Sequence, residues 1–220
     1  MTRSILLQVA TCTAVVLASG LVSVNSALAR KNKFPATGQT TAYQADKHDG
    51  IDGPVDVPDD GTLQRGATLR YKVRKDGTVK DRNTGLIWEV KCSGCGGELH
   101  DVENAYPWSG DIGRDTIWDW LDEINAEGGK GYAGHSDWRI PNLRELQSIV
   151  DYGRCGGCGS DTATIDPIFG PTAVFDGYWS STTSASSPSE AWFVSFNFGS
   201  SFFTGKGFSL PVRAVRGGPK

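Results

Sequence analysis

Residues 136–151, SDWRIPNLRELQSIVD, constrain the fold of this chain more than any other segment. Asn142 is a residue type that caps helix N-termini, and Glu145, three positions later, completes a capping box. Beyond this cap, apolar side chains recur at the spacing of one helical face: Leu143, Leu146, Ile149 and Val150. The segment therefore predicts a short helix that ends near Asp151 and packs one face against a core.

A second helix is predicted within residues 111–129. Thr116 and Asp119 form another capping box, and Gly128 and Gly129 are typical of a helix end. Between these two ends, apolar residues recur at helical spacing: Ile117, Trp120, Leu121 and Ile124.

Strand patterns precede these helices. Residues 69–74 alternate between apolar and basic side chains, which predicts a half-buried strand. Asp76-Gly77 predicts a hairpin turn, and a second strand is expected over residues 86–90. Two interpretations of the basic side chains on the first strand stay open, contact with an anionic partner or an ordinary solvated face: Arg70, Lys72 and Arg74.

Four further strands are predicted after residue 166, over residues 178–181, 191–198, 201–206 and 211–216. In the second of them, the apolar side chains share one face: Trp192, Val194, Phe196 and Phe198. The order of strands, two helices and then an antiparallel strand cluster predicts an α+β architecture, with both helices packed against one side of a sheet.

The chain begins as exported proteins do. Arg3 precedes an apolar run, and Ala27-Leu28-Ala29 fits the small-x-small cleavage pattern, so residues 1–29 are predicted to be a signal peptide. A membrane anchor would need a more uniform apolar span of about 20 residues, and the residues before Cys12 do not suit a lipoprotein. We expect a mature chain without a membrane span that is periplasmic, at the cell surface or secreted.

Residues 30–65 are predicted to form an acidic linker rich in Gly and Pro, followed by one domain over residues 66–220. The spacing of a calcium-binding loop is absent from the linker, which favours a solvated loop over a calcium site. The chain carries a net charge of −3, and cleavage of the leader removes one more positive charge, so nucleic acid is not an expected partner. The linker takes its acidity from six residues: Asp46, Asp49, Asp52, Asp56, Asp59 and Asp60.

Four cysteines follow the leader in two matched Cys-x-x-Cys knuckles: Cys92, Cys95, Cys155 and Cys158. The neighbouring glycines would let four thiolates converge on a zinc ion, with His100 as a weaker alternative ligand. Disulfides are the favoured interpretation, because exported proteins meet oxidants and the two pairs lie further apart than in a zinc ribbon. A thioredoxin-type redox role lacks the βαβ context, and no cofactor other than zinc is suggested.

Five separated blocks resemble one bacterial family. They are residues 75–89 (KDGTVKDRNTGLIWE), 134–151, 178–182 (YWSST), 191–199 with its Ala-Trp and Phe-Gly pairs, and 212–218 (VRAVRGG). In this order the blocks are similar to the C-terminal domain of the Legionella collagen-like adhesin, a family long described as a bacterial domain of unknown function. The resemblance covers roughly residues 66–218.

This resemblance implies a C-type lectin-like fold and an exported binding module, with adhesion to sulfated glycans in some members. Two departures limit what it implies. The chain has no Glu-Pro-Asn, Gln-Pro-Asp or Trp-Asn-Asp triplet, the calcium-dependent sugar-binding signature of true C-type lectins. The collagen-like repeat is also missing, so trimerisation by that route is not implied.

Seven polar and aromatic residues of these blocks are predicted to be structural: Asp137, Trp138, Arg139, Glu145, Trp179, Arg213 and Arg216. A buried arginine needs a partner, and Glu145 or Asp137 could serve. We expect an ion-pair and aromatic network that holds the helices against the closing strands. A polar binding pocket is the alternative.

Nucleophilic catalysis is not supported by the sequence. No serine lies in a Gly-x-Ser-x-Gly elbow, and His48, His100 and His135 are isolated in sequence, none with an obvious nucleophile neighbour. The serine-rich residues 180–189 suit a surface loop, where binding residues concentrate. We therefore expect a non-catalytic binding or adhesion module that recognises a glycan or another surface macromolecule. The alternatives are an enzyme on a formylglycine-generating-like lectin fold and a structural envelope protein.

Overall fold

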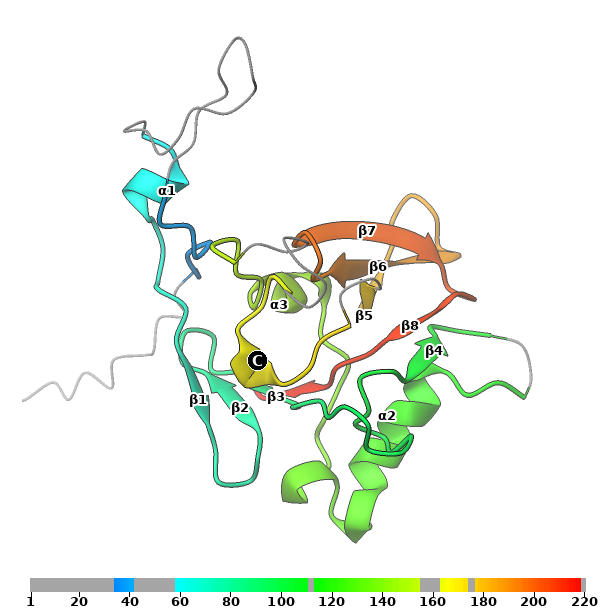
Figure 1. The fold of residues 1–220 in the computed structure, drawn as a ribbon. Helices are drawn as coiled ribbons and strands as arrows, with labels where there is room; N and C mark the ends of the chain where they lie inside the picture. The colour runs from blue at the N-terminus through cyan, green and yellow to red at the C-terminus, as the bar shows by residue number, and fades with distance from the viewer. Residues whose placement is uncertain (1–33, 42–57, 111–112, 155–162, 174–176, 219–220) are drawn as a thin grey trace, which may run out of the picture. The chain divides into compact units, whose positions relative to one another are not determined.

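The structure, a computed structural model, describes residues 34–41, 58–110, 113–154, 163–173 and 177–218. It confirms a mixed α+β architecture with antiparallel sheets and few helices (Figure 1). The elements in chain order are α1 (Asp60–Leu63), β1 (Tyr71–Val73), β2 (Val79–Asp81), β3 (Ile87–Trp88), β4 (Ala105–Pro107), α2 (Ile117–Ala126), α3 (Leu143–Gln147), β5 (Gly177–Thr183), β6 (Glu190–Ser195), β7 (Ser200–Gly205), β8 (Ser209–Pro211) and β9 (Val215–Arg216). Short 3₁₀ helices cover Glu127–Gly129, Tyr132–Gly134 and Pro167–Phe169.

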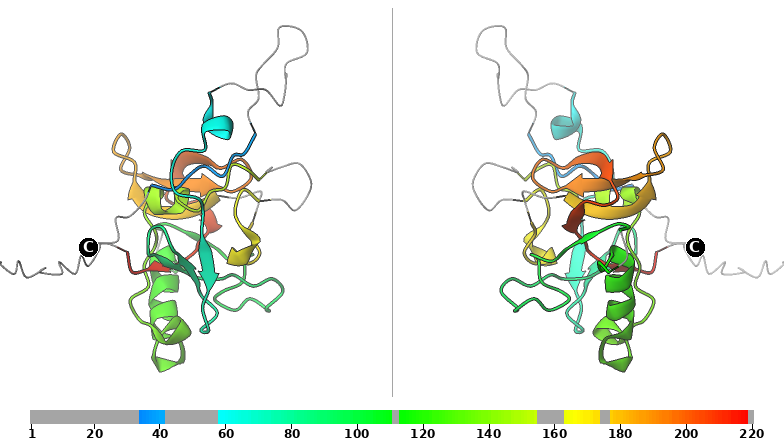
Figure 2. Two further views of the ribbon diagram at one scale, coloured as in Figure 1. Left: turned by 90° about the vertical axis from the view of Figure 1, so that its left-hand side faces the viewer. Right: turned by 90° about the vertical axis from the view of Figure 1, so that its right-hand side faces the viewer.

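The strands form three antiparallel sheets. The first has the order β1-β2-β3-β9, the second pairs β4 with β8, and the third has the order β5-β6-β7. In the first sheet Trp88 lies opposite Val215, so the closing strand completes a sheet that the early hairpin began (Figures 1 and 2). The hairpin turns at Gly77, whose φ of 82° lies in the left-handed region that favours glycine. The predicted Asp-Gly turn is therefore confirmed.

Both predicted helices begin where their capping boxes place them. The Thr116 side chain accepts from backbone N–H groups of α2, and the Asp119 carboxylate accepts from the Thr116 N–H at 2.8 Å. In α3 the Asn142 side chain accepts from the Glu145 N–H at 2.9 Å, and the Glu145 carboxylate accepts from the Asn142 N–H at 2.8 Å. The predicted end of α3 near residue 151 is wrong, because the α-helix stops at Gln147.

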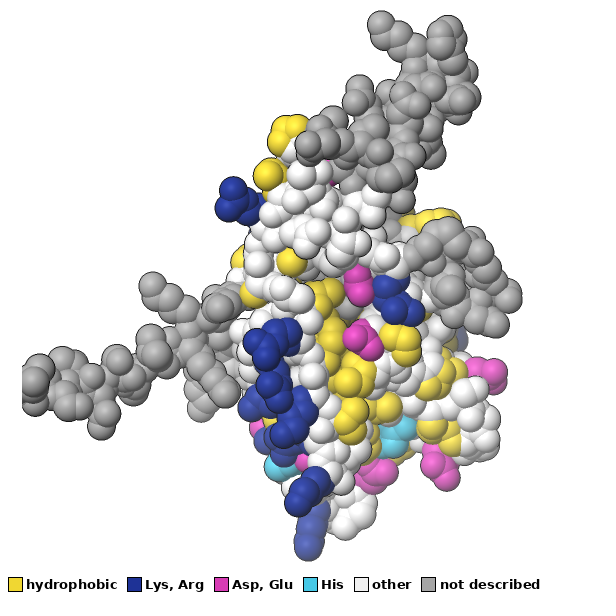
Figure 3. Space-filling view, turned by 60° about the vertical axis from the view of Figure 1, so that its left-hand side comes forward, with side chains coloured by type: hydrophobic (Ala, Val, Ile, Leu, Met, Phe, Trp, Pro, Cys, Tyr) yellow, Lys and Arg dark blue, Asp and Glu magenta, His cyan; other side chains and the backbone are white. Residues whose placement is uncertain are grey.

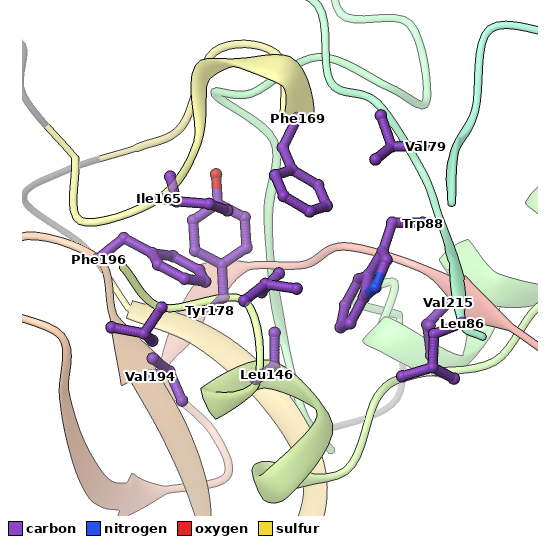
Figure 4. Packing of buried hydrophobic residues seen from close by; sticks show 12 residues of the cluster. Val79, Leu86, Trp88, Leu146, Ile165, Phe169, Tyr178, Val194, Phe196 and Val215 are labelled. Atoms are coloured by element: carbon purple, nitrogen blue, oxygen red, sulfur yellow. The ribbon is translucent and has the colours of Figure 1, made fainter. Parts of the chain in front are cut away.

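The core consists of two hydrophobic clusters. One gathers around Trp88, Phe169 and Tyr178, and Figure 4 shows Leu146 of α3 among these rings. Edge-to-face contacts order this cluster, since the Trp88 and Phe169 ring centroids lie 6.3 Å apart with planes at 88°. The other cluster packs the buried face of α2, through Ile117, Trp120 and Ile124, against residues of the closing segment.

Two predicted strands depart from the structure by more than a shift of one or two residues at an end. The strand expected over residues 191–198 ends at Ser195, and Phe198 is 65% exposed instead of sharing the buried face. The chain turns there through Gly199, which has a φ of 70° and lies against the Tyr152 ring. The strand expected over residues 211–216 is two short strands, β8 and β9, which belong to different sheets.

Part of the predicted linker contacts the domain. Pro35 forms a parallel bridge with Ala67, and the Asp59 side chain caps α1 by accepting from the Thr62 N–H at 3.1 Å. Four of the six acidic linker residues lie outside the described residues, so a calcium loop stays untested: Asp46, Asp49, Asp52 and Asp56. Within the described ranges, no helix combines the length and apolarity that crossing a bilayer requires.

Candidate functional site

A basic face on the hairpin of β1 and β2 is the feature of this surface best suited to binding. Lys72 and Lys80 are direct cross-strand partners, and the Arg82 N–H donates to the Arg70 carbonyl at 2.8 Å. Neighbours on β2, Val79 and Asp81, are buried, so Lys80 and Arg82 point the other way, toward solvent. We call these four side chains the basic face: Arg70, Lys72, Lys80 and Arg82.

The charge of the basic face is not offset by the acidic side chains that the structure describes. Among the described residues, none of its four side chains forms an ion pair, whereas nearby Arg74 is neutralised by Asp76 at 3.0 Å. Like charges directly opposite each other on paired strands destabilise a sheet. Figure 3, which brings this side of the molecule forward, shows Lys and Arg side chains gathered in a row. An anionic ligand would remove this electrostatic cost.

A buried ionic cluster lies where β3 ends. Glu89 is fully buried, and one carboxylate oxygen lies 2.8 Å from both Lys91 Nζ and His100 Nδ1. The other oxygen accepts from the Ala214 N–H at 2.7 Å, and Glu127 contacts His100 Nε2 at 3.1 Å. Lys91 Nζ lies within ion-pair distance of Glu89, but the angles at this contact do not meet the geometry of a hydrogen bond.

The members of this cluster shift each other's pKa. Burial alone would raise the pKa of Glu89, but Lys91 and His100 outweigh burial and hold that pKa below its usual value. Burial would lower the pKa of His100, but its hydrogen bonds to Glu89 and Glu127 raise it. Burial lowers the pKa of Lys91. The Glu89 and Lys91 side chains are 0% and 2% exposed, so a substrate cannot reach them.

Arg213 closes the same region from the last segment of the chain. Its guanidinium is fully buried and donates to the backbone carbonyls of Glu89 at 3.0 Å and Phe169 at 2.7 Å. It also donates to the Thr172 hydroxyl at 3.2 Å. Sequence reasoning offered Glu145 or Asp137 as the partner of a buried arginine, whereas Arg213 uses carbonyl oxygens instead.

Except for Trp179, which lies on β5, the other predicted structural residues gather around β9. Arg139 donates through both terminal nitrogens to Glu145, at 2.7 and 2.6 Å, and Arg216 donates to Asp137 at 2.6 Å. Arg139 and Val215 exchange backbone hydrogen bonds of 2.9 Å. The buried Trp138 and Trp179 donate their indole N–H groups to the carbonyls of Tyr132 and Tyr106. These contacts describe where the residues lie, and their structural role stays a prediction.

The first cysteine knuckle is a disulfide between Cys92 and Cys95. Cys155 and Cys158 lie outside the described residues, so zinc binding by all four cysteines stays a prediction. In the oxidised state Cys92 and Cys95 have no thiolate to offer a metal. His100, the weaker alternative ligand, has a carboxylate at each ring nitrogen. No group of three His, Cys, Asp or Glu side chains suited to a metal occurs among the described residues.

Three pockets on the described surface are not lined by the cysteine and histidine residues considered above. Their volumes are about 310, 360 and 250 Å³. The first lies between residues 34–37 and α3, where Arg144, Gln147 and Tyr152 contribute to the wall. Its lining offers a surface for contact and no nucleophile–base pair.

Sequence reasoning missed half of the basic face and most of the buried cluster. It identified the row of Arg70 and Lys72 but not Lys80 and Arg82, although the Asp-Gly turn implied that the two rows pair. Glu89 could have been noticed as a carboxylate within an otherwise apolar strand. Its partners are distant in sequence and could not have been named.

The family comparison agrees with the blocks found in the sequence. The model of the family described as the Lcl C-terminal domain matches residues 77–216, from the hairpin turn to the end of β9. No curated protein matches the chain.

Proposed function

The chain belongs to the Lcl C-terminal domain family, and on that premise we propose that it is an exported, non-catalytic adhesion module that recognises an anionic glycan. The predicted leader over residues 1–29 supports export. The order of elements supports a C-type lectin-like fold, which we include in the proposal. The family is associated with the Legionella collagen-like adhesin, which supports a role in binding surfaces.

The observation that carries the proposal is the unneutralised basic face. Four basic side chains lie in two cross-strand pairs on a chain whose net charge is −3, so the positive charge is local. Two paired rows of basic side chains suit an extended chain that presents repeated negative charges. Sulfate and carboxylate groups of a polysaccharide meet this description, and arginine can bind each of them through two parallel hydrogen bonds.

The test measures retention on immobilised heparin, a sulfated glycan, with uncharged dextran as the reference matrix. Lys72→Glu/Lys80→Glu should elute at much lower salt than wild type, because fewer counterions are released when it binds. Lys130→Glu/Arg144→Glu is the matched control, since it changes the net charge equally at two exposed sites away from the basic face. The control should elute with wild type.

Two results would contradict the proposal. If wild type is retained no more strongly by heparin than by dextran, the protein has no binding site for a polyanion. If both double variants elute from heparin at equally reduced salt, binding depends on the net charge of the protein and not on the basic face. Circular dichroism of each variant verifies that the fold is intact.

A further inference from the structure

Strand β7 presents an edge that no other described strand pairs with. It is the outer strand of the sheet β5-β6-β7, and its sequence, SSFFTG, contains neither charge nor proline. Exposed edges invite pairing with another strand, and proteins usually blunt them with charged residues, proline or a covering segment.

The two edge strands of the four-stranded sheet, β1 and β9, show such protection. Strand β1 carries Lys72 on its solvent face with Arg70 and Arg74 beside it. Strand β9 is covered, because Val215 exchanges backbone hydrogen bonds with Arg139. Strand β7 has neither kind of protection, which suggests that its edge pairs with another strand.

The register of β7 on β6 shows which backbone groups face outward. Phe202 lies opposite Phe193, and the Lys206 N–H donates to the Ser189 carbonyl at 3.0 Å in the same register. Because alternate residues of an antiparallel strand face the same neighbour, Ser200, Phe202 and Thr204 bond toward β6. The N–H and C=O groups of Ser201 and Phe203 therefore point away from the sheet. They find no backbone partner in the part of the chain that the structure describes.

The exposed side chains of β7 make this edge self-complementary. Phe202 is 51% exposed and its ring centroid lies 5.8 Å from that of Phe193. A two-fold axis perpendicular to the sheet at Phe202 would place this ring beside Phe202 of a second copy, so that the Phe193–Phe202 row continues across the junction. The same register sets Ser201 opposite Phe203 of the second copy, where their outward groups meet. No like charges oppose one another.

We propose that two copies of this chain associate through antiparallel pairing of their β7 strands, joining two three-stranded sheets into one. Such an interface is isologous, because each copy contributes the same residues. It satisfies every outward backbone group of Ser201 and Phe203 and covers Phe202. A peptide from an unrelated protein would also find backbone partners at this edge, but it would not by itself continue the aromatic row.

The test compares molecular mass in solution by sedimentation equilibrium, using the chain without its leader. Wild type should have the mass of a dimer that dissociates on dilution. Phe202→Lys should be monomeric over the same concentrations, because two ammonium groups would face each other across the axis. Val73→Lys is the matched control, since Val73 is 53% exposed on the other edge strand, β1, and its substitution should leave the dimer intact.

Amide hydrogen exchange adds a readout at single residues. In dimeric wild type the Ser201 and Phe203 amides should be protected, and Phe202→Lys should lose that protection while residues 202 and 204 keep theirs through β6. A monomer at all concentrations, a dimer unaffected by Phe202→Lys, or unprotected Ser201 and Phe203 amides in the dimer would each overturn the proposal. None of these outcomes depends on heparin binding, so the proposal stands apart from the proposed function.

Discussion

At the scale of single residues, the Glu89 cluster shows how this domain holds charge inside a core. Removing a carboxylate from water is costly, and Glu89 is stabilised there by Lys91, His100 and the Ala214 N–H. The contacts tie the end of β3 to the segment before β4, to the residues after α2 and to the closing segment. The cluster therefore joins parts of the chain that no continuous strand or helix connects.

The raised pKa of His100 predicts a pH-dependent contribution to stability. A histidine whose pKa is higher when folded stabilises fully below its unfolded pKa, near 6.5, and loses that contribution as the pH rises through the folded pKa. His100→Gln keeps a donor toward Glu89 but removes the charge. We expect it to lower the free energy of unfolding by about 1–3 kcal/mol at pH below 6.5, and by less at higher pH.

Urea denaturation across this pH range measures the difference. A difference between wild type and His100→Gln that stays constant with pH would contradict the prediction. Glu89 acts in the opposite direction, since its lowered pKa gives stability above its ordinary value of 4.5 that is lost as the pH falls through the folded pKa. The pH range should therefore stay above 4.5.

At the scale of elements, sequence patterns predicted two helix starts and the hairpin turn, but not α1, β2 or the end of α3. The capping boxes at Thr116 and Asn142 placed the starts of α2 and α3, and Asp76-Gly77 placed the hairpin. Strand β4 was missed, because three residues ending in proline carry no alternation and gain their form only by pairing with β8. The single strand predicted over residues 211–216 was wrong. Residues 212–214 are buried as strand residues often are, but they connect β8 and β9, which belong to different sheets.

In the candidate site, too, local patterns were predictable from the sequence and contacts between distant segments were not. Arg70 and Lys72 could be predicted to share a face from the alternation along β1. Lys80 and Arg82 could be added only by knowing which residues lie opposite Arg70 and Lys72. The buried cluster depends on Glu89, His100 and Glu127, which only the folded chain brings together. Contacts between distant segments are set by packing, and a single sequence does not reveal them.

The basic face yields a prediction in which stability and binding change in opposite directions. Lys72→Glu replaces a like-charged cross-strand pair with an opposite-charged pair to Lys80, so it should raise the free energy of unfolding by about 0.2–1 kcal/mol. The same change should lower the salt concentration that elutes the protein from heparin. Thermal unfolding and the heparin column measure the two effects. A less stable variant, or one that binds as wild type does, would count against an anion-binding role for this face.

At the scale of the whole molecule, the last strand joins the end of the domain's sequence to the hairpin near its start. Strand β9 pairs with β3 across most of the domain's sequence, and Val215 and Trp88 are buried together there. A chain that ends at Ala214 should lose this pairing, the backbone bonds to Arg139 and the Arg216–Asp137 ion pair. We expect it not to fold cooperatively, as measured by the near-ultraviolet circular dichroism of its tryptophans.

A chain that ends at Gly217 is the control for this truncation. It keeps β9 and should unfold with the cooperativity of the full chain. If the shorter chain, ending at Ala214, retains a native near-ultraviolet spectrum and a sharp transition, then β9 is dispensable.

The pairing of β3 with β9 also bears on when this protein can fold. Native contacts between segments so far apart require a long loop to close, which slows folding. Until residues 215 and 216 have been synthesised, Ile87 and Trp88 have no pairing partner from β9. The sheet β1-β2-β3-β9 therefore cannot be completed before residues 215 and 216 have been synthesised. Such a delay would suit the export that we propose, because a polypeptide crosses a membrane translocon unfolded.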